Sequence, residues 1–104
     1  MGDGAVWLDS VAAMMKFVLL ATLSPQGLQT LKLTPERLLE VNREIEDLGG
    51  RVLDQWAVLG YYDFLSVIEA PDEMAAATMV AELSARGSAT FETLTIIDPD
   101  EVFA

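Results

Sequence analysis

The strongest constraint on the fold is the short connection between two β-like runs in the middle of the chain. Runs 51–59 and 62–69 are rich in aliphatic and aromatic residues, and only Gly60 and Tyr61 separate them. Gly60 can adopt a positive φ at no steric cost, which suits the turn of a hairpin. Parallel strands need a connection of about a dozen residues or more, so these two runs are predicted to pair as antiparallel neighbours.

Two further β-like runs, 16–23 and 89–97, lie outside the hairpin. The first is almost continuously apolar, which is typical of a strand buried on both faces, and the second is rich in threonine. Run 16–23 could pass for a short signal peptide, but no small-residue cleavage site follows it and Ser24-Pro25 indicates a helix start. We therefore interpret it as a strand and expect the protein to be cytoplasmic.

The first helical region is predicted between runs 16–23 and 51–59. Ser24-Pro25 and Thr34-Pro35 both resemble an N-cap followed by proline at the first helical position. We expect a short helical segment, a bend before Pro35, and a main helix that ends at Gly49-Gly50. Apolar residues of the main helix recur on one face, at Leu38, Val41, Ile45 and Leu48.

The second helical region begins at Pro71-Asp72-Glu73, where acidic side chains suit the positive end of the helix dipole. It is rich in alanine and ends at Gly87. The predicted order is therefore β-α-β-β-α-β. Two right-handed crossovers with a hairpin between them give an α+β, ferredoxin-like fold, a four-stranded antiparallel sheet with two helices on one face.

The predicted domain occupies residues 15–98. We interpret residues 1–14 as an N-terminal extension that the fold does not require, and 99–104 as an acidic C-terminal tail. A short helix from Ser10, packed on a neighbour, is the alternative for the extension.

Composition excludes several classes of function. The chain has 17 acidic and 6 basic residues and a net charge of −11, so we expect no nucleic-acid and no membrane partner. It has neither cysteine nor histidine, which excludes zinc sites and both Ser-His-Asp and Cys-His catalysis. We assign no metal, no cofactor and no catalytic residue, although carboxylates alone could hold a hard cation.

Four residues are candidates for ligand binding: Tyr62, Asp63, Trp56 and Glu92. A phenol beside a carboxylate at a strand start could orient a small ligand or move a proton. The competing interpretation is structural, with Asp63 accepting backbone N–H groups and the aromatic residues packing. By alternation Trp56 would share a face with Val52, Asp54 and Val58, and Glu92 could face Glu69 across the sheet.

The arginines 37, 51 and 86 are expected to pair with neighbouring acids rather than to bind substrate.

A series of residues across 16–97 resembles the GYD family. It consists of Gly27, Pro35 with Arg37, Gly49-Gly50, Gly60-x-Tyr62-Asp63, Glu69 with Pro71, and Gly87 followed by Glu92-Thr93. The resemblance implies a ferredoxin-like domain of the dimeric α/β-barrel type. The family tends to carry arginine and then threonine before the Glu-Thr pair, where this chain has Thr90 and Phe91. Because this chain departs from the family there, we expect no anion-binding arginine at that place.

Large apolar residues occur on both sides of the predicted strands, so one side of the sheet would stay uncovered in a monomer. We expect a homodimer or higher homo-oligomer formed through the open sheet face. The main hypothesis is a small oligomeric domain that binds a small molecule or acts as an assembly module. The alternative, by analogy with barrel relatives, is a cofactor-independent monooxygenase- or isomerase-like enzyme.

Overall fold

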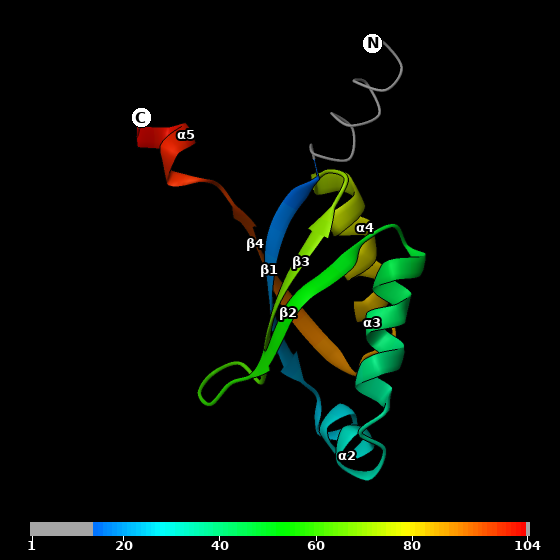
Figure 1. The fold of residues 1–104 in the computed structure, drawn as a ribbon. Coiled ribbons are helices and arrows are strands. Elements are labelled where there is room, and N and C mark those ends of the chain that lie inside the picture. The colour runs from blue at the N-terminus through cyan, green and yellow to red at the C-terminus, as the bar shows by residue number, and fades with distance from the viewer. Residues whose placement is uncertain (1–13, 104) are drawn as a thin grey trace.

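A computed structural model describes residues 14–103, which form one four-stranded antiparallel sheet with helices packed on one side (Figure 1). The strand order is β2-β3-β1-β4. This arrangement confirms the predicted α+β, ferredoxin-like fold. The elements in chain order are β1 (Met15–Leu23), α2 (Pro25–Leu33), α3 (Arg37–Asp47), β2 (Arg51–Ala57), β3 (Phe64–Ala70), α4 (Glu73–Ser84), β4 (Ala89–Ile96) and α5 (Pro99–Phe103).

The core lies between the sheet and helices α3 and α4. Phe17 and Ile68 point from the two central strands, Ile45 comes from α3 and Met79 from α4, and each is at most 3% exposed. Since residues two apart in a strand share a face, these positions identify the helix-covered side of each strand. The opposite side, which we call the open face, carries the residues between them.

Helix boundaries follow the signals in the sequence. The Ser24 hydroxyl accepts the Gly27 amide at 3.0 Å, and a carboxylate oxygen of Asp72 accepts the Ala75 amide at 2.8 Å. Gly49 and Gly87 follow helices α3 and α4 with φ of 97° and 75°, values that favour glycine. The two-part first helical region, with its bend before Pro35, is confirmed by the separate helices α2 and α3.

The hairpin between β2 and β3 is wider than predicted. Strand β2 ends at Ala57 rather than residue 59, and β3 begins at Phe64 rather than residue 62. The connection is therefore a loop, residues 58–63, with Gly60 at a φ of 139°. The loop is wider because Asp63 hydrogen-bonds to β1 and Val58 through its backbone instead of entering the turn.

A register shift in β2 corrects the predicted faces of this strand. Val52 pairs with Ile68 and Asp54 pairs with Val67, so Leu53 is an extra residue between them. Such a β-bulge reverses the alternation of side chains. Val52 therefore packs against the core, whereas Asp54 and Trp56 lie on the open face, and the expectation that all three share one face was wrong.

The expectations for residues 1–14 lie outside the described residues, apart from Met14. The acidic segment after β4 contains the short helix α5, which lies beyond the end of the strand and away from the helix layer (Figure 1). Its Val102 and Phe103 are 56% and 85% exposed. None of the helices within residues 14–103 is both long and apolar enough to span a membrane.

Candidate functional site

The open face of the sheet carries a continuous apolar surface. The register places the side chains of the open face in two adjacent rows, each with one acidic residue at an end. The rows are Asp54, Val67, Val18 and Leu94, then Trp56, Leu65, Leu20 and Glu92. We call Val18, Leu20, Trp56, Leu65, Val67 and Leu94 the open-face patch. Helices α2, α3 and α4 all lie on the other side of the sheet. Within the described chain Trp56 is 51% and Leu94 46% exposed, so the patch is accessible to a partner.

Tyr62 and Glu92 meet at one edge of the patch. The Tyr62 hydroxyl donates a hydrogen bond to the Glu92 carboxylate, which joins the 58–63 loop to β4. The ring of Tyr61 packs against that of Tyr62 edge to face, with centroids 5.0 Å apart. Together with Leu20 of β1 these side chains surround an open hollow on the face of the sheet.

The hydrogen bond to Glu92 raises the pKa of Tyr62 above its ordinary value of 10.0, and desolvation and the negative charge of Glu92 act in the same direction. Each of these effects favours the neutral phenol over the phenolate. Tyr62 is therefore held as a hydrogen-bond donor at neutral pH and is a poor general base.

Asp63 is occupied by the backbone of β1. One of its carboxylate oxygens accepts the Leu23 amide at 2.8 Å, and its own amide donates to the Ala21 carbonyl at 2.8 Å. Its carbonyl accepts the Val58 amide at 2.9 Å. The first two bonds join the 58–63 loop to the end of β1, and the third closes the loop on itself, as the structural interpretation of Asp63 expects. A ligand role for Asp63 stays a prediction.

The four predicted site residues do not converge on one point. Tyr62 and Glu92 are together, and Asp63 is beside them in sequence but bonded to β1. Trp56 lies on β2 and Glu92 on β4, which are the two edge strands of the sheet. Three strand spacings separate these edges, about 14 Å. Trp56 is therefore part of the open-face patch and Tyr62 with Glu92 lies at its edge, so the candidates do not line one pocket.

Glu69 and Glu92 do not face each other. Glu69 pairs in register with Lys16 and forms an ion pair of 3.3 Å with Arg51, whereas Glu92 pairs in register with Leu20, four residues further along β1. Arg37 and Arg86 also form ion pairs, with Glu40 and Glu44 of α3. The expectation that these three arginines pair with acids is confirmed.

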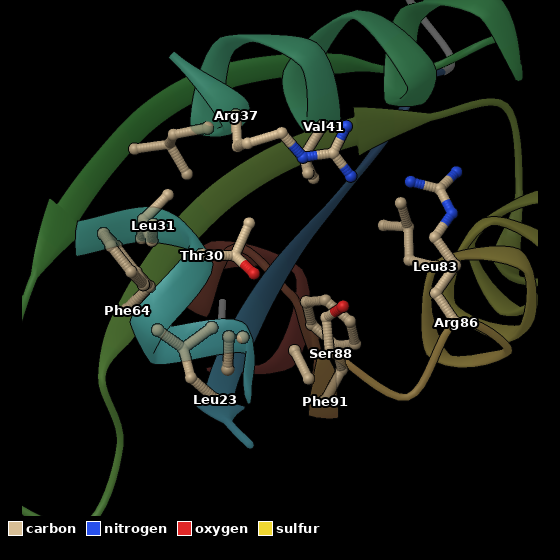
Figure 2. A pocket seen from close by; sticks show the side chains of 14 residues that line it. Leu23, Thr30, Leu31, Arg37, Val41, Phe64, Leu83, Arg86, Ser88 and Phe91 are labelled. Carbon is tan, nitrogen blue, oxygen red and sulfur yellow. The ribbon is translucent and has the colours of Figure 1, made fainter. Parts of the chain in front are cut away.

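Sequence reasoning missed a pocket on the helix side of the sheet, which Arg37 and Arg86 border (Figure 2). The two residues are far apart in the chain and in different helical regions, so only the packing of α3 and α4 brings them to one place. The one feature of the sequence that points to these two arginines is the scarcity of basic residues, 6 against 17 acidic ones. Among residues 14–103, no group of acidic residues is arranged to hold a metal ion.

Comparisons with known proteins agree with this picture of the fold. The family model described as GYD domain matches residues 17–104, which confirms the resemblance and extends it past Ile97. A "Glutamine synthetase and cystathionine beta-lyase binding protein" from Thermus thermophilus is 45% identical over 92 residues, 88% of this chain and 97% of the relative.

Two solved structures share the fold at low identity. MtbAldR superposes with a TM-score of 0.65 at 14% identity, and the leucine response regulatory protein LrpA of Mycobacterium tuberculosis with 0.53 at 10%. The matches cover 85% and 89% of this chain, which spans 55% of each of those chains. At such identities the likeness shows the fold alone.

Proposed function

The chain belongs to the GYD domain family, and we propose that it is a non-catalytic module that assembles through its open face and binds other proteins. The observation that carries the proposal is the open-face patch, which none of the helices α2, α3 and α4 covers. The name of the relative from Thermus thermophilus, a binding protein for two enzymes, supports a protein-binding role. The position of Trp56 in the patch and of Tyr62 at its edge also supports it, because aromatic residues are enriched at protein interfaces.

Burial of apolar area supplies the driving force for self-association. A stable interface typically buries about 800 Å² on each partner. Hiding apolar surface is worth roughly 25 cal/mol per Å², against which association loses translational and rotational freedom. A two-fold contact between two open faces would cover Val18, Leu20, Leu65 and Val67, which lie at the centre of the sheet, with the polar groups of Tyr62 and Glu92 at its border.

The alternative of a cofactor-independent enzyme needs a group that can accept a proton. Tyr62 is the candidate with a displaced pKa, and the displacement is upward. A raised pKa makes the phenolate rarer at neutral pH, so it opposes a role as general base. No observation at this site favours the enzyme over the binding module.

The assembly is tested by sedimentation velocity at micromolar concentration with the variant Leu65→Asp. Leu65 lies in the middle of the open face, and a charge there would be desolvated in the dimer. We expect wild type to sediment as a dimer or larger species and Leu65→Asp as a folded monomer.

Leu39→Asp is the matched control, because Leu39 is 60% exposed on α3, on the other side of the sheet. It should sediment like wild type. Phe64 is not a suitable neighbour for this test, although alternation alone left its face open: it lies on the helix side, opposite Ala21. Monomeric wild type would overturn the assembly proposal.

Protein binding is tested separately by co-sedimentation with purified glutamine synthetase and with purified cystathionine β-lyase. We expect at least one of the two to bind wild-type protein. Absence of binding to both would contradict this part of the proposal and leave the assembly result standing.

A further inference from the structure

The pocket on the helix side is bounded by α2, α3, the end of α4 and three strands of the sheet (Figure 2). Its volume is about 110 Å³. Most of the wall is apolar, with Leu38 and Val41 from α3, Leu83 from α4, and Phe64 and Phe91 from the sheet. An apolar cavity of roughly 150 Å³ in another protein binds benzene, so this space suits one ring or one branched alkyl group.

Small residues on the helix side of the sheet help to form the pocket. Ala21 of β1 and Ala89 of β4 leave room below the helices. Helix α2 is fixed at its start by the Ser24 amide, which donates to the Ser88 carbonyl at 2.9 Å. A Cβ added to Gly27 would lie 2.2 Å from that same carbonyl oxygen, so α2 is already at its closest approach. The space cannot close by moving α2 inward at this point.

Two guanidinium groups border the pocket. Figure 2 shows Arg37 and Arg86 extending from opposite sides toward the gap between α3 and the end of α4. Arg37 donates through one terminal nitrogen to Glu40, and Arg86 through one terminal nitrogen to Glu44. A guanidinium has five N–H donors, so these ion pairs leave most of the donors of both arginines for another acceptor. The side chains are 41% and 40% exposed, so water and solutes reach them.

We propose that this pocket binds a small hydrophobic monocarboxylate, with its ring or branched alkyl group inside and its carboxylate between Arg37 and Arg86. Planar guanidinium groups bind carboxylates through paired, charge-assisted hydrogen bonds. The apolar wall gains from burial of the hydrocarbon part, and the hydroxyl groups of Thr30 and Ser88 are the other polar groups on the lining. The inference is independent of the proposed assembly, because the pocket and the open-face patch lie on opposite sides of the sheet.

The charges around the pocket restrict the affinity and the type of ligand. Glu40 and Glu44 occupy part of each guanidinium and compete with an incoming carboxylate. The net charge of −11 adds a general repulsion of anions. A small ligand in a small pocket therefore binds with a dissociation constant on the order of a millimolar. Short dicarboxylates and inorganic phosphate lack the apolar group that the wall requires.

The test uses phenylacetate and 4-methylpentanoate as probes, with phenylacetamide as an uncharged control of nearly the same shape. Binding is followed by two-dimensional NMR of the methyl groups, where Val41 and Leu83 report on the pocket and Val18 and Val67 on the open face. We expect saturable shifts of the first pair with both carboxylates. Phenylacetamide should bind at least tenfold more weakly, since hydrogen bonds to a charged group are lost.

Variants separate recognition of the carboxylate from filling of the pocket. Arg37→Gln and Arg86→Gln should each weaken phenylacetate binding about tenfold and leave phenylacetamide unchanged. Arg51→Gln removes an arginine ion pair with Glu69, away from the pocket, and should change neither. Glu44→Gln should strengthen phenylacetate binding, because it frees Arg86 from its partner. A purely structural role of these ion pairs would not produce that gain.

Three results would overturn the inference. The first is the absence of methyl shifts at Val41 and Leu83 with either carboxylate at tens of millimolar. The second is equal affinity for phenylacetate and phenylacetamide, which would make the site a simple apolar cavity. The third is unchanged phenylacetate affinity in folded Arg37→Gln and Arg86→Gln. Each result leaves sedimentation and enzyme binding unaffected, so failure here is distinguishable from failure of the proposed function.

Discussion

Tyr62 and Asp63 are neighbours in the sequence, but the structure gives them different roles. The Tyr62 hydroxyl bonds to the Glu92 side chain, which is 30 residues away, whereas the Asp63 carboxylate bonds to the backbone of β1. Two consecutive residues thus provide a side-chain contact at the border of the open-face patch and a bond that holds the loop in place. The Tyr62–Glu92 hydrogen bond depends on the protonation of the Tyr62 hydroxyl, whose pKa Glu92 raises.

Replacing Glu92 by glutamine should lower the pKa of Tyr62 toward its ordinary value of 10.0, because the carboxylate causes most of the rise. Because the pKa is higher in the folded chain than in the unfolded chain, the stability from this pair is complete below about pH 10 and is lost as the pH rises through the folded value. The measurement is a ¹³C NMR titration of the Tyr62 ring. Glu69→Gln, on the same face but paired with Arg51, serves as the control. An unchanged Tyr62 titration in Glu92→Gln would refute the assigned cause.

At the scale of elements, the order of strands and helices and their caps could be predicted, because they depend on local residues such as Ser24-Pro25, Asp72 and Gly49. The β-bulge at Leu53 could not, since one added residue in a strand of mixed polar and apolar residues leaves no mark on composition or propensity. That residue decides on which face Trp56 lies.

The candidate site could be predicted only in part, for the same reason. Tyr62 and Glu92 were both identified, but their contact depends on the register between β1 and β4 and on the width of the 58–63 loop. The pocket depends on the closeness of α2 to Ser88, which the sequence records only as a glycine at position 27.

Removing the Asp63 carboxylate should release the 58–63 loop from β1. Asp63→Ala leaves the Leu23 amide without its acceptor, and we expect a loss of about 1–3 kcal/mol in the free energy of unfolding. Hydrogen exchange should accelerate at Leu23 while amides in the middle of β1 keep their protection. Asp54→Ala, which removes an exposed acid on the open face of β2, should change neither quantity appreciably. Retained protection of the Leu23 amide in Asp63→Ala would contradict the proposed attachment of the 58–63 loop to β1 through the Asp63 carboxylate.

At the scale of the whole molecule, two opposing properties bear on the proposed association. The open-face patch favours contact between copies, and the net charge of −11 on each copy opposes it. Repulsion between exposed charges is screened over about 10 Å at 0.1 M salt and about 3 Å at 1 M, whereas burial of apolar area persists. Association through the open face should therefore strengthen as salt is added.

The melting temperature of wild-type protein should rise with protein concentration, because a dimer is favoured over unfolded monomers by mass action. The rise should be present at low salt and the dimer dissociation constant should fall in 0.5 M NaCl. Leu65→Asp should melt at one temperature regardless of concentration. Differential scanning calorimetry over a roughly hundredfold concentration range measures the melting temperatures of wild type and of Leu65→Asp. A concentration-independent melting temperature for wild type would count against assembly.

The β-bulge in β2 also bears on how the sheet can grow. β2 is an edge strand, and its outer backbone groups offer a template on which a strand from another molecule could add, the route that leads to fibrils. The irregular register between Val52 and Asp54 breaks the regular spacing of hydrogen-bonding groups that such an added strand would need. Strand addition along β2 is therefore limited to short stretches on either side of Leu53, which protects an apolar, sheet-rich protein against open-ended aggregation.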